Sequence, residues 1–211
     1  SEIIKKYMPL YDRLDCLDLY HTRLDGSSKA NIIKELNPNV VVDAIIAKKN
    51  LGTSINDAPI VIGVGPGFEA KKDCHLVVET KRGHYLGKVI EEGSAIPNTG
   101  IPGDIGGYTK ERIIRASGEG KIKPVARIGD YVKKGDVVAY IDGVEVLAEI
   151  DGIIRGMLQD GIEVFKGMKS GDIDPRCEKN HCFTISDKAR SIGGGVLEGI
   201  LYMNNKKLNL E

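Results

Sequence analysis

Residues 58–70 read APIVIGVGPGFEA, an apolar run that ends in glycines. The run Ile60–Val64 has the length of a buried strand and is rich in β-branched residues, so we expect a strand there. A second apolar run, Leu76–Val78, also ends in residues that packing alone would not select. We therefore expect two buried strands whose polar ends form a functional edge.

Upstream of this stretch, the sequence predicts a helix and a third strand. A capping serine precedes a helix expected at residues 29–36, and residues 40–42 are three valines that run into Asp43. A helix, a short turn and a β-branched strand are typical of an α/β layer. Ligands of such sheets bind at the strand ends. We therefore expect Asp43, Gly65 and Glu79 to lie near one edge of one sheet.

Downstream, the chain contains an internal repeat at an offset of 32 residues. Gly120, Ile122, Gly129, Val132, Lys134, Gly135, Ile141 and Asp142 recur as Gly152, Ile154, Gly161, Val164, Lys166, Gly167, Ile173 and Asp174. Two such copies resemble the halves of the biotinyl/lipoyl carrier fold, a flattened β sandwich with a pseudo-twofold axis. Carrier domains attach their cofactor to a lysine between the halves, and residues 135–165 contain none. We therefore expect a structural or docking module with no lipoyl or biotinyl group.

The predicted fold class is α+β or α/β. Residues 1–110 with 177–211 form a small mixed α/β domain, and residues 111–176 form an inserted barrel-sandwich-hybrid module. A C-terminal helix capped by Ser186 contains three consecutive glycines, 193–195. Because they cost a helix on the order of 3 kcal/mol relative to alanine, we expect another element or a ligand to approach them closely. This segment should fold back onto the central stretch.

The polar residues of these segments make up the candidate site. Glycine turns let backbone N–H groups approach an anion, and an arginine can hold a phosphate or carboxylate through two bonds. Glu79 with His84 is a candidate acid/base pair. The candidate ligand-binding residues are Asp43, Lys48, Asn50, Gly65, Pro66, Gly67, Thr80, Arg82, Asn98, Thr99, Ser186, Lys188, Arg190 and Gly194. The alternative is a set of tight turns with charged strand ends that face water.

Composition argues against several classes of function. The 30 basic and 30 acidic residues balance, so nothing favours nucleic acid or an anionic membrane as partner. No apolar run approaches the roughly 20 residues that span a bilayer, and the N-terminus lacks a signal-peptide pattern, so we expect a cytoplasmic protein. Phe68 stands where a dinucleotide-binding loop has its third glycine, which argues against a dinucleotide site. Cys177, His181 and Cys182 are metal-ligand types, but their spacing suits free thiols better, and we expect no metal.

Longer motifs indicate a family. They are DAIIAKKNLGT (43–53), IGVGPGFEAKKDCHLVVETKRGHYLGKVI (62–90), GSAIPNTGIPG (93–103), GDIDPR (171–176) and SDKARSIGGGVLEGIL (186–201). Together they resemble the YqeB family of the selenium-dependent molybdenum hydroxylase system. The resemblance implies an accessory protein in the maturation of the hydroxylase, with a molybdopterin-type or selenium intermediate as ligand.

The resemblance also implies an N-terminal glycine-rich βαβ segment that this sequence lacks, as expected for a fragment or a shortened relative. Two functions stay open. One is a non-catalytic factor that binds an anionic cofactor or intermediate and docks on a molybdenum hydroxylase. The other is an enzyme that acts on a phosphorylated cofactor intermediate, with Glu79 or His84 as proton carrier.

Overall fold

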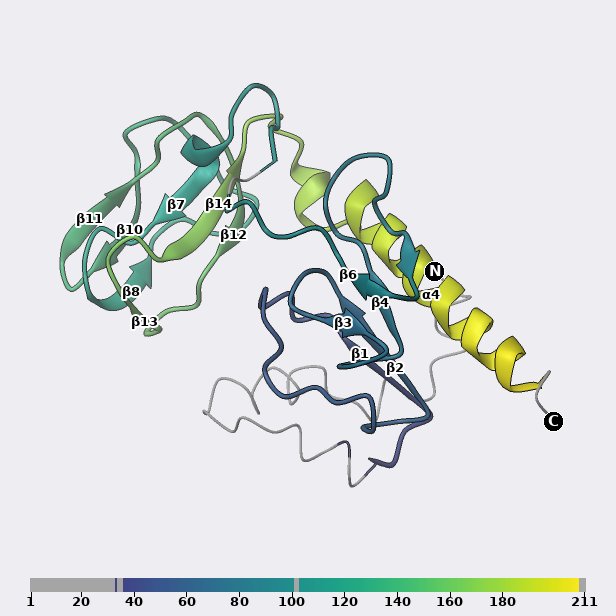
Figure 1. The fold of residues 1–211 in the computed structure, drawn as a ribbon. Helices are drawn as coiled ribbons and strands as arrows, with labels where there is room; N and C mark the ends of the chain where they lie inside the picture. Colours follow the sequence, from purple (N-terminus) through teal and green to yellow (C-terminus); the bar gives the residue numbers. More distant parts are fainter. Residues whose placement is uncertain (1–32, 34–35, 101–102, 209–211) are drawn as a thin grey trace. The chain divides into compact units, whose positions relative to one another are not determined.

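The structure of the 211-residue chain is a computed structural model that describes residues 33, 36–100 and 103–208. The protein is mixed and mostly sheet, with one long helix at its C-terminal end (Figure 1). Contacts divide the chain into two compact units, Ser1–Asn98 with Lys188–Glu211, and Thr99–Asp187. The helix expected at residues 29–36 lies outside the described residues, except for Ile33 and Leu36, which are helical.

The first unit is built on a four-stranded sheet in the order β1-β2-β4-β5. Its strands are β1 (Val40–Asp43), β2 (Ile60–Val64), β4 (Leu76–Val78) and β5 (Val89–Ile90). The first three are parallel and β5 is antiparallel. β3 (Glu69–Ala70) and β6 (Gly93–Ser94) form a small separate ladder. The three strands expected from the apolar runs are therefore confirmed.

Both faces of this sheet are covered, which explains why its strands are continuously apolar. The helix α4 (Asp187–Leu208) covers one face (Figure 1), where Val196 and Ile200 pack against Ile62. On the other face, Phe68 packs with Val61 and its neighbours. The helix is thus held by one apolar stripe.

The glycines of α4 divide into two kinds. A methyl group at Gly195 would collide with the backbone carbonyl of Gly87, and one at Gly199 would lie 3.1 Å from Leu76 Cδ1. Gly193 and Gly194 face open space. The expected close approach by another element is therefore confirmed for Gly195. Among the described residues, no other element approaches Gly193 or Gly194 in this way.

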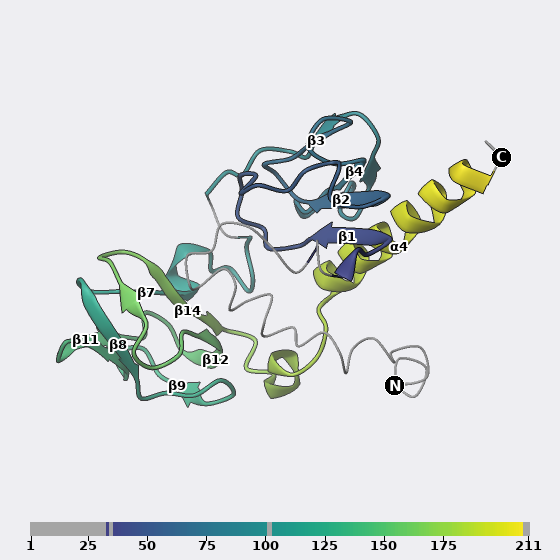
Figure 2. The same cartoon turned by 90° about the horizontal axis from the view of Figure 1, so that it is seen from below.

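The second unit contains two four-stranded sheets and two short 3-10 helices (Figures 1 and 2). Its elements are η1 (Lys110–Arg112), β7 (Ile113–Arg115), β8 (Gly120–Pro124), β9 (Tyr131–Val132), β10 (Val137–Ile141), β11 (Val144–Leu147), β12 (Gly152–Met157), β13 (Glu163–Val164), β14 (Lys169–Asp174) and η2 (Lys179–Cys182). The sheets have the orders β11-β10-β8-β13 and β7-β14-β12-β9. This unit is wider at both ends than the module expected at residues 111–176.

The strand pairing of this unit follows the sequence repeat. Ile141 pairs with Ile122 in one sheet, and Ile173 pairs with Ile154 in the other, each 32 residues later. The short strands are exchanged between the copies, because β9 pairs with β12 and β13 pairs with β8. An offset of 32 therefore maps one sheet onto the other, which is a pseudo-twofold relation around one shared core.

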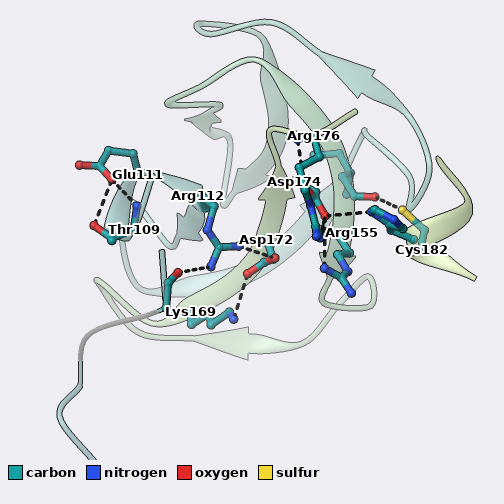
Figure 3. A network of polar contacts seen from close by, with 12 residues as sticks. Thr109, Glu111, Arg112, Arg155, Lys169, Asp172, Asp174, Arg176 and Cys182 are labelled. Carbon is teal, nitrogen blue, oxygen red and sulfur yellow. Dashed lines mark hydrogen bonds and ion pairs between the residues drawn. The ribbon is translucent and has the colours of Figure 1, made fainter. Parts of the chain in front are cut away.

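One carboxylate holds the end of this unit together, as Figure 3 shows. Asp174 is 1% exposed and accepts hydrogen bonds from Arg176 Nη2 at 2.6 Å and Nε at 2.9 Å, and from Arg155 Nη1 at 3.2 Å. Hydrogen bonding to Arg176 lowers the pKa of Asp174 from 3.8 to about 2. The charge thus stays on the carboxylate although it is buried.

Candidate functional site

The carboxyl ends of the three parallel strands lie at one edge of the first sheet, as expected. The register pairs Asp43 with Gly63 and Val64 with Val78, so Asp43, Gly65 and Glu79 follow neighbouring strand ends. Such an edge is where open α/β sheets bind ligands.

The Gly65-Pro66-Gly67 turn is a packed corner of the protein. A methyl group at Gly67, where φ is +110°, would lie 2.5 Å from the backbone N and Cα of Lys49, and one at Gly65 would lie 2.9 Å from Thr80 Oγ1. The N–H of Gly65 donates to the carbonyl of Val78 at 2.8 Å. The expectation that this N–H faces an anion is therefore wrong. The glycines instead let two neighbouring segments meet at this corner.

The loop after β1 is held by its own side chains. Asp43 accepts hydrogen bonds from the Ile45 N–H at 3.1 Å and from Thr53 Oγ1 at 2.6 Å. Asn50 Oδ1 accepts from the N–H groups of Gly52 and Thr53, both at 2.8 Å. Asp43 and Asn50 therefore order the loop that carries Lys48 and Lys49, and both lysines are exposed.

Glu79 is a buried carboxylate that binds backbone. It is 2% exposed, and its Oε1 accepts from the N–H groups of Thr80 and Lys81, both at 2.7 Å. Its Oε2 accepts from the Ile96 N–H at 2.8 Å. Glu79 thus ties the end of β4 to the segment after β6, and both of its oxygens are occupied.

The ring of His84 contacts a neighbouring tyrosine rather than Glu79. Its exposed ring packs edge-on against Tyr85 with 5.0 Å between centroids. Across the described ranges, no hydrogen bond joins His84 to Glu79. The geometry gives the predicted acid/base pair no direct link.

Lys188, at the start of α4, lies close to Arg82 and Glu79. Lys188 is half-buried, and burial lowers its pKa from the ordinary value of 10.5. The charge of Arg82 lowers it further, while the charge of Glu79 raises it. The expected return of the C-terminal segment to the central stretch is therefore confirmed for Lys188 and Arg82.

The other candidate residues have varied positions. Arg190 is exposed on α4, and Gly194 lines a hollow of about 540 Å³ with Leu197 and Leu201. Pro66 lies between the two glycines of the packed turn, and Asn98 is exposed at the end of the first unit. Thr99 and Ser186 belong to the second unit.

Sequence reasoning missed two backbone positions that shape this edge. Gly87 receives the helix at Gly195, and the Ile96 N–H receives the carboxylate of Glu79. Gly87 carries a signal, because a lone glycine inside HYLGKVI marks a close backbone approach. Ile96 carries none, since any residue could supply its N–H.

The chain was compared with known proteins. It is 52% identical over 173 residues to the uncharacterized protein YqeB of Escherichia coli (strain K12). This match supports the YqeB family. It covers 82% of the chain but 32% of that protein, so the chain spans about a third of its relative's length. No protein-family model matches the chain. Among the described residues, no helix has the length and hydrophobicity needed to cross a membrane.

Proposed function

We propose that the first unit binds a small anion at the carboxyl edge of its sheet, with Arg82 and Lys188 as the charged contacts. The observation that carries this proposal is the closeness of two cations at this edge, the exposed Arg82 and the half-buried Lys188, where burial and like charge both lower the pKa of Lys188. Holding such a pair together costs free energy. An anion that contacts both cations would offset this cost, which is a reason for a protein to keep them.

A binding role is better supported than acid/base catalysis at the same edge. Both carboxylate oxygens of Glu79 accept hydrogen bonds, three in all, from backbone N–H groups. Glu79 therefore holds the backbone in position. Lys48 and Lys49 would add positive potential, since their backbone lies against Gly67.

From the family resemblance, we extend the proposal to the whole protein. It would be a cytoplasmic accessory factor for maturation of a selenium-dependent molybdenum hydroxylase, and its anion would be a molybdopterin-type cofactor or a selenium intermediate. The second unit would take the biotinyl/lipoyl carrier fold without its cofactor, because the pseudo-twofold exchange of short strands supports that fold and residues 135–165 lack lysine. It would serve as a scaffold or docking module.

Titration of the full chain with inorganic phosphate and pyrophosphate tests the anion site. Arg82→Ala and Lys188→Ala should each weaken binding about tenfold or more, and the double variant should lose less than the sum because both contact one anion. Lys206→Ala is the matched control on the same helix, where the lysine lies over the Tyr202 ring. Equal binding by all four variants would contradict the proposal.

Native mass spectrometry of protein purified from its own cells tests the ligand class. A retained cofactor or intermediate should appear as added mass, and Arg82→Ala should remove it. Added mass that persists in Arg82→Ala would place the ligand elsewhere on the protein.

A further inference from the structure

The second unit contains two copies of one backbone, and they differ in what they expose. An open hollow of about 790 Å³ is lined by Val125, Tyr131 and other residues between positions 125 and 137, together with Ile153 of β12 and Lys179 of η2. Phe183, just after η2, reaches the rim, because a methyl group at Gly129 would lie 3.3 Å from its Cζ. Ile128 directly precedes Gly129, which lines the hollow. We call Val125, Ile128, Tyr131 and Phe183 the apolar face.

These four side chains are unusually exposed for their type. The exposed fractions are 49% for Val125, 43% for Ile128, 54% for Tyr131 and 67% for Phe183. Single exposed apolar residues are normal on a protein surface, but a group around one hollow marks an interaction site.

The second copy provides an internal comparison. The residues 32 positions after Ile128 and Tyr131 are Asp160 and Glu163, and both are exposed. The same backbone therefore accepts acidic residues at these two positions. Packing within the unit does not require the isoleucine or the tyrosine, so their apolar character points to a contact outside this unit.

From this asymmetry we infer that the apolar face joins two copies of the chain in a twofold dimer. A twofold interface uses the same patch on both partners, so a projecting group and its receiving hollow must lie side by side on one face. Phe183 projects beside the hollow and fits this requirement. In the dimer, Phe183 of each copy enters the hollow of the other.

The charges of this face are also self-complementary. Asp130, Asp136 and Lys179 line the hollow, so the rim carries both signs. One carboxylate oxygen of each aspartate accepts a hydrogen bond from a backbone N–H of its own turn. Asp130 accepts from Arg127 and Asp136 from Lys133, both at 2.8 Å. Lys179 of one copy can therefore approach an aspartate of the other.

Sedimentation of the full chain from about 1 µM to about 300 µM tests this inference, a range that brackets weak and moderate dimers. The wild-type chain should dimerise. The double variant Ile128→Asp, Tyr131→Glu should weaken the dimer about tenfold or more, because interface contacts of aromatic residues dominate binding. These substitutions copy the residues of the second repeat, so the backbone is known to accept them.

Two further variants complete the experiment. Phe183→Ser alone should also weaken the dimer, because it removes the projecting group. Val144→Asp is the matched control, an exposed apolar position of β11 outside the hollow, and should leave the dimer unchanged. A wild-type chain that stays monomeric throughout, or a dimer that the face variants leave intact, would overturn the inference.

Discussion

In each of the two units one carboxylate is almost fully buried, Glu79 at 2% exposed and Asp174 at 1%, and the two are satisfied in different ways. Asp174 is bound by the guanidinium groups of Arg155 and Arg176. Glu79 is bound by three backbone N–H groups, and Arg82 and Lys188 lie close to it. The first arrangement uses cations to hold a fold together. The second uses neutral backbone donors to hold a loop beside two cations.

This difference assigns roles to the two regions. A buried charge must be paired or hydrogen-bonded, and either solution is stable. A carboxylate paired with arginines neutralises those charges, whereas one held by backbone N–H groups fixes the position of a loop. Three variants can break or sharpen this contrast.

Asp174→Asn should have the largest effect on stability. Losing the carboxylate charge leaves Arg155 and Arg176 without their partner, and we expect a loss of about 3 kcal/mol in the free energy of unfolding, measured with denaturant. Asp172→Asn is the control, since Asp172 is more exposed and bonds Arg112 at 3.4 Å. An equal loss in both variants would mean that the two arginines make Asp174 no more important for stability than the ion pair of Asp172 with Arg112.

The same carboxylate should leave a signature in acid. Because the folded pKa of Asp174 is lowered from 3.8 to about 2, its contribution is present above about pH 4 and is lost as pH falls toward 2. Asp174→Asn should lose this part of the pH dependence. An unchanged acid profile in the variant would show that other carboxylates cause it.

Gly195→Ala should have the next largest effect, because it displaces the helix that holds Lys188. The added methyl group collides with the Gly87 carbonyl, and we expect a loss of about 2 kcal/mol in the free energy of unfolding together with weaker phosphate binding. Gly194→Ala is the matched control. That methyl group meets open space, so the variant should gain up to about 1 kcal/mol. A gain in both variants would contradict the close crossing.

Lys188→Met should have the smallest effect on stability and the opposite sign. A lysine whose folded pKa lies below its unfolded value costs stability at neutral pH, and the cost disappears as pH rises through 10.5. We expect a gain of up to about 0.5 kcal/mol at pH 7, with weaker phosphate binding. Calorimetric titration and thermal unfolding of the same sample separate the two effects. A loss of stability would show that Lys188 serves the fold.

The sequence by itself determined the strands and the repeat. Apolar runs at β1, β2 and β4 gave correct strands because both faces of the sheet are covered. The spacing of 32 marked two copies of one unit, and the structure pairs their strands in the same way, β8 with β10 and β12 with β14. These features depend on local composition and periodicity, which are written along the chain.

Only the tertiary structure decided which polar groups meet. The approach of Lys188 to Arg82, the crossing of Gly195 over Gly87 and the use of the Gly65 N–H inside the sheet join positions far apart in the chain. The sequence marked several of these residues as candidates. The sequence could not tell whether a polar group forms its hydrogen bond within the fold or can offer it to a ligand. This depends on which backbone groups packing brings within about 3 Å of one another.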